Sequence, residues 1–526
     1  MPERIIHDVV VIGAGVAGAL VARSLAEAGR KVALVEAGGG WRRDEAARRY
    51  RSAIERNLEA PYGQWPWLRV EGGASGGEYR PLYMRGIGGA TWHWTAITPR
   101  FLPEDFRMRS LYGVGRDWPI DYQTLEPWYV LAEKALGVAG DSRDDHGSPR
   151  SAPYPMPAIP MTHADQRLAA RWRELRVDGQ PVRVAPLPAA RNSRPYDDRP
   201  ACRGNNTCTP ICPIGASYSA EADVRRAVRA GAMLASRAVA WKFDLDGQRR
   251  LTAVHVRHPD GSRRVIRGRR FVIACNSIET PRLLLLAACE ACPAGLANRS
   301  GQVGRNLMDH ALVQKTFQCE EPLYIGRGPQ SVSTVLLGRG GDFRRRHAAA
   351  KFFIGNDLNI QRLATEVLKA RDRWHDALPR LRRAAIHQGI IGAEIEQLPD
   401  PDNRVRLDEK RRDALGFAAA RLEYRLGDYA TRGAEHWEAV MDRLIREAGG
   451  RPTGGSFSLS SHHPAGTARM GDNPRDSVVN ADCRSHDHAN LFIVGGSVFP
   501  TLGTANPTLT IAALALRLAA HLRALG

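Results

Sequence analysis

The sequence of 526 residues predicts an α/β fold in which a parallel-sheet domain is assembled from separated segments, with a second, α+β domain inserted between them. Three observations predict this arrangement. A glycine-rich turn follows an apolar strand near the start of the chain, and a second such strand and turn follow only at 491–497. Between them, residues 316–450 lack such turns and carry more charge. Within that stretch, the alternation at 404–407 is typical of an antiparallel strand.

Residues 9–36 have the pattern of a β-α-β unit that binds a dinucleotide. An apolar strand at 9–12 leads into Gly13-x-Gly15-x-x-Gly18, and a second apolar strand ends at Glu36. The first glycine makes a tight turn, the second lets backbone approach a pyrophosphate, and the third lets the helix pack on the strand. The helix N-terminus favours phosphate, and the acid suits a ribose. The unit is therefore Rossmann-like, and the motif alone fits NAD as well as FAD.

The later elements follow from periodicity and from the residues that end each element. Residues 41–80 are expected to be mostly loop, and Gly88-Gly89-Ala90-Thr91 forms a second glycine turn. The further expected elements are a helix at 121–136, a connection at 148–160, irregular structure at 195–220, a strand at 267–276, helices at 281–288 and 429–448, a strand at 491–494 with its glycine turn, and a closing helix at 508–525.

The net charge of +19 is carried mostly by arginine. It is consistent with an anionic partner surface or with a solvated basic surface. Because no basic helix or aromatic-interleaved motif is present, the sequence does not predict nucleic-acid binding. The short polar start predicts no signal peptide, and no apolar run approaches the roughly 20 residues of a transmembrane helix.

Three closely spaced cysteines, Cys202, Cys208 and Cys212, lie in a segment rich in proline, glycine and asparagine. Closely spaced thiolates followed by a proline suit an iron–sulfur cluster, and three ligands favour a three-iron cluster. A structural zinc would normally require a fourth ligand, and no histidine lies nearby. A disulfide with one free thiol is the alternative in an oxidising compartment.

Several motifs together resemble the glucose-methanol-choline (GMC) family of flavin oxidoreductases over essentially the whole chain. They are residues 13–18 with Glu36, 88–91, 303–310, 463–467 and 506–507. Within the family the chain is most similar to the large catalytic subunits of bacterial membrane-associated dehydrogenases for gluconate, fructose, sorbitol and glucose. Residues 191–196 and the cysteine segment are the most specific marks. The resemblance implies FAD, oxidation of a CH–OH group, and partner subunits.

The resemblance also implies a division of the chain. The parts are 1–150, the N-terminal part of the FAD-binding domain; 151–220, a connection with the iron–sulfur loop; 221–315, the middle of the FAD-binding domain; 316–454, the substrate-binding domain; and 455–526, the C-terminal part with the catalytic residues. The cofactor-binding residues it implies are Gly13, Gly15, Gly18, Glu36, Gly88, Gly89, Thr91, His93, Gly496 and Ser497. Two alternatives stay open for His93, which either attaches FAD covalently or packs against it.

The resemblance implies that His463 is the catalytic base and that Asn506 lies at the substrate oxygen. An imidazole suits removal of a hydroxyl proton, because its pKa of ~6.5 lies near working pH. Asn506 is equally suited to cap a helix, with Pro507 at the first helical position. Asp309 and His310 are expected to fix a loop between the domains.

The sequence thus predicts an FAD-dependent dehydrogenase of a sugar, polyol or sugar acid. Its electrons are expected to leave through a [3Fe-4S] cluster at the three cysteines to a haem c subunit or a quinone. The alternatives are an oxidase of the same fold that uses dioxygen, and a flavin-free binding protein. A small subunit with an export signal would bring the chain to the periplasmic face of the inner membrane, where it would associate peripherally; a cytoplasmic enzyme is the other possibility.

Overall fold

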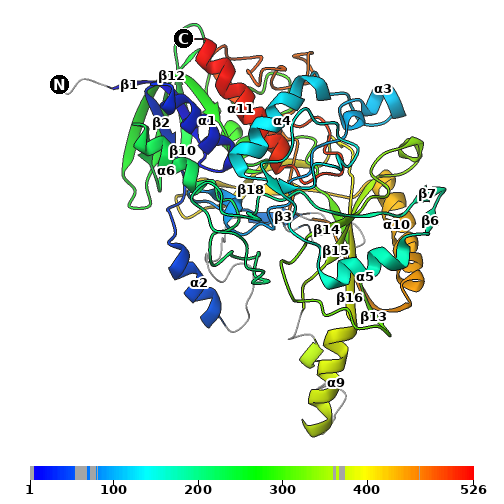
Figure 1. Cartoon of the computed structure of the whole chain (residues 1–526). Helices are drawn as coiled ribbons and strands as arrows, with labels where there is room; N and C mark the ends of the chain where they lie inside the picture. The colour runs from blue at the N-terminus through cyan, green and yellow to red at the C-terminus, as the bar shows by residue number, and fades with distance from the viewer. Residues whose placement is uncertain are drawn as a thin grey trace.

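The computed structural model describes residues 5–53, 68–71, 79, 81–358, 363–365, 374–460 and 462–525. Figure 1 shows two main bodies, one built around a parallel sheet near the termini and one around a long antiparallel sheet below it. The chain passes between them several times, so that segments distant in sequence meet at their junction.

The parallel sheet has the order β9-β2-β1-β12, and β20 also pairs with β12. Its strands are β9 (Met233–Ala235), β2 (Val32–Val35), β1 (Ile6–Ile12), β12 (Arg263–Ile273) and β20 (Leu491–Ile493). All pairs within this set are parallel. They come from the start, the middle and the end of the chain, which confirms a Rossmann-like domain assembled from separated segments. The antiparallel strands β10 (Val239–Leu245) and β11 (Leu251–Arg257) extend the sheet beyond β12.

Helices cover this sheet because they and the strands are apolar where they meet. The helices are α1 (Val16–Glu27), α4 (Tyr122–Leu136), α6 (Glu221–Arg229), α7 (Glu279–Leu286) and α11 (Thr508–Ala524). Helix α1 packs between α6 and α11, and α4 packs on the other side of α11 (Figure 1). The apolar residues at 9–12 are fully buried, as expected for a strand covered on both faces.

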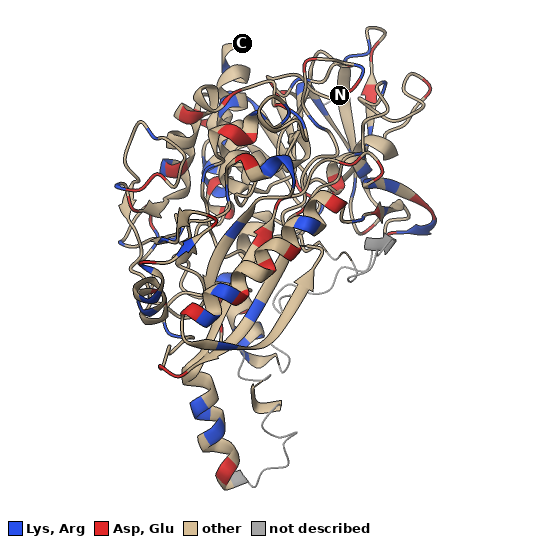
Figure 2. Cartoon of the chain, turned by 90° about the vertical axis from the view of Figure 1, so that its right-hand side faces the viewer, with Lys and Arg blue, Asp and Glu red and all other residues tan. Residues whose placement is uncertain are grey.

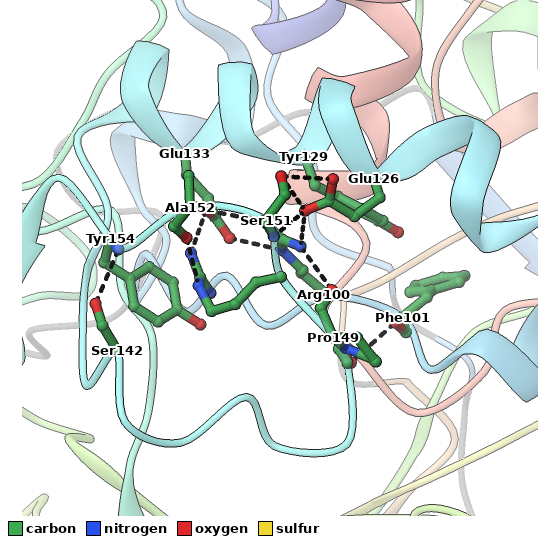
Figure 3. Close-up of polar contacts among 12 residues, drawn as sticks. Arg100, Phe101, Glu126, Tyr129, Glu133, Ser142, Pro149, Ser151, Ala152 and Tyr154 are labelled. Atoms are coloured by element: carbon green, nitrogen blue, oxygen red, sulfur yellow. Dashed lines mark hydrogen bonds and ion pairs between the residues drawn. The ribbon is translucent and has the colours of Figure 1, made fainter.

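Buried ion pairs connect α4 to the loops beneath it, as Figure 3 shows. Arg100 donates through Nε to Glu133 at 2.8 Å and through Nη1 to Glu126 at 2.9 Å. Arg150 donates to the second oxygen of Glu133 at 2.6 Å. The side chains of Arg100 and Glu133 are each only 1% exposed. Removing one partner would therefore leave an uncompensated charge inside the protein.

The second body is a four-stranded antiparallel sheet of order β15-β16-β13-β19. Its strands are β13 (Ala311–Cys319), β15 (Ala350–Gly355), β16 (Gln388–Ile395) and β19 (Gly450–Ser458). Helix α10 (Asp428–Glu447) packs against it, helix α5 (His163–Trp172) packs on α10, and both helices share its apolar core. Helix α9 (Trp374–His387) precedes β16 and extends away from the rest of the molecule (Figure 1).

A smaller sheet lies at the junction of the two bodies. Strands β17 (Arg404–Arg412) and β18 (Ala418–Glu423) are antiparallel, and β18 pairs in parallel with β3 (Leu68–Glu71). The predicted boundaries at 315/316 and 454/455 fall inside β13 and β19. The division into domains therefore stays a prediction, made on sequence alone.

Short elements complete the described chain. They are α2 (Arg43–Ser52), α3 (Met108–Tyr112), β4 (Ala139–Gly140), β5 (Met156–Pro157), β6 (Arg176–Val177), β7 (Gln180–Pro181), β8 (Val184–Pro186), β14 (Ser333–Val335), and the 3₁₀ turns η1 (Gly89–Trp92), η2 (Pro103–Phe106), η3 (Asp342–Arg345) and η4 (Gly496–Val498). The expected loop at 41–80 is wrong for α2 and β3. Helix α2 was missed because it has only one buried residue, Ala46, and so lacks an apolar stripe.

The basic charge is spread over the fold. In the view of Figure 2, segments of Lys and Arg are interspersed with segments of Asp and Glu over most elements. Among the residues that the structure describes, no helix is long and apolar enough to span a bilayer.

Candidate active site

The glycine turn after β1 gives its three glycines three different roles. A Cβ on Gly13, whose φ is +103°, would lie 2.6 Å from the carbonyl oxygen of Ala274 at the end of β12. A Cβ on Gly18 would lie 1.9 Å from the carbonyl oxygen of Gly13. A Cβ on Gly15 would meet no described heavy atom within 4 Å, and Gly15 lines a cavity. The turn is thus packed tightly on the sheet side and open where a pyrophosphate would approach.

Glu36 follows β2 and faces the same turn. Its carboxylate accepts hydrogen bonds from the backbone N–H groups of Ala14 and Gly38, both at 2.8 Å. Burial raises the pKa of Glu36, and the two N–H groups oppose that rise. The side chain lines the cavity, so its position fits the ribose-binding acid that the motif predicts.

The second glycine turn lies directly on the first. The N–H of Gly88 donates to the carbonyl oxygen of Ala14 at 2.9 Å, and a Cβ on Gly89 would lie 3.1 Å from the Cα of Gly15. Thr91 donates to the carbonyl oxygen of Gly88 and accepts from the N–H of Ala220 at 3.0 Å. Its hydroxyl therefore holds the turn in place and joins it to the start of α6.

A cavity of about 560 Å³ opens between the glycine turns and the four-stranded sheet. Most of the predicted cofactor and catalytic residues line it: Gly13, Gly15, Glu36, Gly89, Thr91, His93, Gly496, His463 and Asn506. Gly18, Gly88 and Ser497 lie outside the lining set. Gly18 and Gly88 act through the packing of the turns, and Ser497 is fully buried.

His463 and Asn506 meet at one end of this cavity. The Nδ2 atom of Asn506 lies 3.0 Å from Nε2 of His463. The Oδ1 atom of Asn506 accepts from the ammonium of Lys351. Pro507, not Asn506, is the N-cap residue of α11. The prediction that Asn506 caps this helix is therefore wrong, because its side-chain amide forms hydrogen bonds with Lys351 and His463 instead.

A second histidine fixes the proton positions on His463. Nε2 of His310 lies 2.9 Å from the carbonyl oxygen of Gly503, which can only accept, so this nitrogen carries a hydrogen. Burial lowers the pKa of His310, so its Nδ1 is unprotonated. That Nδ1 lies 3.0 Å from Nδ1 of His463, which must then donate. Nε2 of His463 is therefore the basic nitrogen, and it accepts from Asn506.

Burial also keeps His463 neutral. It lowers the pKa of His463 to about 3, although the negative charge of Glu394 acts to raise that pKa. Asp309 holds the backbone of both histidines, since its Oδ1 accepts from the N–H groups of His310 and His463 at 2.8 Å. Burial raises the pKa of Asp309 to about 7, and these hydrogen bonds oppose the rise. Asp309 thus fixes a loop as expected, whereas His310 contacts the predicted base directly.

Sequence reasoning missed Lys351 and Glu394, which lie beside this pair. Nζ of Lys351 lies 2.7 Å from Oε2 of Glu394. A ring nitrogen of His310, a ring nitrogen of His463 and a carboxylate oxygen of Glu394 all lie within 4.8 Å of one another. A signal was present: each charge stands alone in an apolar strand, Lys351 among residues 348–354 and Glu394 among residues 390–395. Charged side chains are rarely fully buried unless they are paired, so two lone charges in apolar strands are candidates for a buried ion pair.

His93 lines the cavity immediately after η1. Burial lowers the pKa of His93 to about 4, and the charge of His462 acts in the same direction. The imidazole is therefore neutral at physiological pH, as a nucleophile or a packing group would be.

The cysteine loop reaches the wall of the same cavity. All three of its cysteines are free thiols. The guanidinium of Arg191 donates to Sγ of Cys208 at 3.1 Å, and the N–H of Gly204 donates to Sγ of Cys202 at 3.4 Å. Burial raises the pKa of Cys202, the neighbouring sulfurs add to that rise, and Arg191 opposes it. Thr209, between Cys208 and Cys212, lines the cavity.

Comparison with known proteins identifies what the chain is similar to. Family models described as GMC oxidoreductase match residues 187–312 and 399–515, and one described as FAD dependent oxidoreductase matches residues 8–100. The fructose dehydrogenase large subunit of Gluconobacter japonicus is 37% identical, over 98% of each chain. The 2-methyl-1,2-propanediol dehydrogenase of Mycolicibacterium austroafricanum is 29% identical, over 97% of this chain and 94% of that protein.

Among solved structures, pyridoxine 4-oxidase from Mesorbium loti has the same fold. Its TM-score is 0.68 at 19% identity, over 98% of this chain and 99% of that one.

Proposed function

Since this chain belongs to the GMC oxidoreductase family, and is an FAD-dependent oxidoreductase acting on CH–OH groups, we propose that it is a dehydrogenase of a sugar, polyol or sugar acid. One observation carries the proposal. The hydrogen bonds of His310 leave Nε2 of His463 as an unprotonated nitrogen at the cavity, beside the amide of Asn506. An alcohol oxidation requires such a base within hydrogen-bond reach of the substrate hydroxyl.

The residues of the cavity fit FAD. The open space at Gly15 and the acid at Glu36 suit the pyrophosphate and the ribose of its ADP half. Helix α1 begins directly after Gly15, so its N-terminal N–H groups and dipole favour the phosphates. Bound FAD supplies the acceptor for the hydride that leaves the carbinol carbon.

The protein's own part is to hold the hydroxyl and to take its proton. We place the substrate hydroxyl between Nε2 of His463, to which it donates, and Nδ2 of Asn506, from which it accepts, so that it replaces the direct hydrogen bond between these two side chains. When His463 takes the proton, its Nδ1–H still donates to His310, and the carboxylate of Glu394 stabilises the imidazolium. A base in this role typically contributes about 10²- to 10⁴-fold to the rate.

We further propose that Cys202, Cys208 and Cys212 hold a [3Fe-4S] cluster. The three thiols are free, and N–H groups donate hydrogen bonds to two of their sulfurs, as suits the ligands of an iron–sulfur cluster. The cluster would supply a one-electron carrier between the flavin site and a haem c subunit or a quinone. Small and haem c subunits would hold the enzyme at the periplasmic face of the membrane. Electron paramagnetic resonance of the oxidised protein, with elemental iron analysis, tests the cluster; protein without iron contradicts it.

His93 is proposed as a site of covalent FAD attachment, because it is neutral and lines the cavity. Precipitation of the protein with acid tests the bond. Flavin retained in the pellet supports attachment, and flavin released entirely into the supernatant excludes it.

The experiment that tests the function is a screen of neutral sugars, polyols and sugar acids with an artificial electron acceptor. The proposal expects turnover with at least one of these classes and little hydrogen peroxide under air. Stoichiometric hydrogen peroxide would favour an oxidase of the same fold. Flavin-loaded protein that oxidises none of them would contradict the proposal.

A further inference from the structure

One wall of the cavity is the face of the four-stranded sheet. Alternate residues of a strand point to the same side, and here they carry their side chains into the cavity in two rows. The first row holds Leu312, Glu394 and Lys351, which are directly paired across β13, β16 and β15. The second row holds Gln314, Gly392 and Phe353. All of these except Gly392 line the cavity.

The first row places a buried ion pair next to the proposed base. Lys351 is 1% exposed and Glu394 is 8% exposed. Burial opposes ionisation of Glu394, but the Lys351 ammonium and the nearby histidines lower its pKa to about 2. The ammonium has three N–H bonds; it donates one to Asn506 and lies in ion-pair contact with Glu394. The pair can therefore still donate to and accept from a ligand in the cavity.

The second row places an aromatic ring beside the ion pair. A Cβ on Gly392 would lie 2.3 Å from Cζ of Phe353. The absence of a side chain at Gly392 lets the ring lie against the sheet. The wall thus offers a charged pair near His463 and an apolar surface, Phe353 with Leu312, beside it.

We propose that this wall selects an uncharged substrate that carries a second hydroxyl group next to the carbinol to be oxidised. Glu394 accepts a hydrogen bond from that second hydroxyl, Lys351 donates one to its oxygen, and the C–H face of the carbon chain packs on Phe353. A carboxylate in the same place would meet the negative charge of Glu394 and, unlike a hydroxyl, has no hydrogen to donate to it. The inference rests on the proposed function and narrows its substrate class to neutral sugars and polyols, excluding sugar acids.

Matched substrate pairs test this selection. D-glucitol and D-gluconate differ only at C1, and so do D-fructose and 2-keto-D-gluconate. The wild-type enzyme should prefer the neutral member of whichever pair it oxidises by about 100-fold or more in kcat/KM, because juxtaposed like charges at a binding site cost several kcal/mol. A preference for the acid would overturn the inference and leave the proposed function standing. Failure to oxidise any neutral or acidic sugar would instead contradict the proposed function.

The variant Glu394→Gln tests which residue makes the selection. It should lower kcat/KM for the neutral substrate by about tenfold or more, the effect of losing a hydrogen bond to a charged group. The kcat/KM for the acidic substrate should stay the same or rise, so that the preference for the neutral substrate becomes smaller. If kcat/KM falls by the same factor for both members of a pair, Glu394 acts only through Asn506 and His463, and the inference is wrong.

A glycine pair tests the apolar part of the wall. Gly392→Ala must displace the ring of Phe353, so KM for the neutral substrate should rise while kcat changes little. Gly455→Ala, in the exposed part of β19, adds a Cβ with ordinary contacts of 3.5 Å and more, and should leave both constants unchanged. Flavin content and the thermal midpoint show whether each variant is folded. If folded Gly392→Ala keeps the wild-type KM, Phe353 does not contact the substrate.

Discussion

At the scale of single residues, the proton positions on two histidines decide what His463 can do. The carbonyl oxygen of Gly503 requires a hydrogen on Nε2 of His310, and burial lowers the pKa of His310 and keeps its ring neutral, so His310 presents an unprotonated Nδ1 to His463. His310 does not line the cavity, so we expect it to be a positioning residue for the base. Its role is to hold the proton of His463 on Nδ1, so that Nε2 is the unprotonated nitrogen.

His310→Ala should therefore lower kcat about 10- to 100-fold, as loss of a group that orients a functional histidine commonly does. KM should change little, because the side chain does not reach the cavity. His310→Asn retains an oxygen that can accept from His463 and should recover most of kcat. Steady-state kinetics of both variants check this. Equal losses in the two variants, or a change confined to KM, would contradict the assignment.

For residues that lie close in sequence, the local packing could be predicted from the motif. Gly13, Gly15, Gly18 and Glu36 could be predicted from one β-α-β motif, which also contains the contacts of Gly18 with Gly13 and of Glu36 with Ala14, whereas Gly13 packs on Ala274 of a later segment. Lys351 and Glu394 were not predicted, because strand register alone brings them together from 43 positions apart, 351 against 394. Asn506 was ambiguous for a related reason. Its sequence context fits a cap, and only the position of His463 and Lys351 shows where its amide points.

At the scale of elements, the glycines of the first turn should respond differently to the same change. Gly18→Ala places a Cβ on the carbonyl oxygen of Gly13, so α1 must move from β1, at a typical cost of about 1–3 kcal/mol. Gly15→Ala has room in the protein, and its backbone is extended. It should leave the stability of the FAD-free protein unchanged but lower its affinity for FAD. Thermal unfolding and FAD titration check both. An unchanged FAD affinity in Gly15→Ala would mean that the turn does not approach the cofactor.

A separate prediction concerns the buried ion pairs between α4 and the loops beneath it. Arg100→Met removes the cation shared by Glu126 and Glu133 (Figure 3) and should destabilise the fold by about 3–5 kcal/mol. The control is Arg143→Met, which removes a side chain that is 90% exposed and paired with Asp141. It should cost at most about 1 kcal/mol. Chemical denaturation measures both, and similar values would show that the buried ion pairs contribute little.

Elements with a clear apolar stripe were also predictable. The expected helix at 121–136 is confirmed as α4, with Asp121 as its N-cap, and that at 429–448 is confirmed as α10. Helix α2 and strand β3 were missed, because α2 is nearly all polar and β3 pairs with a strand about 350 positions away, 68 against 420. Local sequence carries no information about such a partner.

At the scale of the whole molecule, the fold buries neutral histidines around the cavity. Burial lowers the pKa of His93 to about 4 and that of His463 to about 3, below the value near 6.5 in an unfolded chain. Between these values the unfolded chain binds more protons than the folded one, so stability must fall as the pH decreases. Each of the two histidines should lower the free energy of unfolding by about 2 kcal/mol at pH 5 relative to pH 8.

Thermal unfolding of the FAD-free protein between pH 8 and pH 5 checks this dependence, because attachment of FAD would alter the imidazole of His93. The midpoint should fall on acidification, and His463→Asn should reduce the fall. A midpoint that is independent of pH in this range would contradict the burial of neutral imidazoles.

In the proposed reaction, His463 removes the hydroxyl proton while FAD takes the hydride. Anaerobic mixing of the FAD-loaded enzyme with excess D-fructose or D-glucitol, followed in the visible flavin absorption band, tests it most directly. The wild-type flavin should be bleached by at least one of them, and the flavin of FAD-loaded His463→Asn should be bleached about 10²- to 10⁴-fold more slowly. Equal rates of bleaching in the two proteins would contradict it.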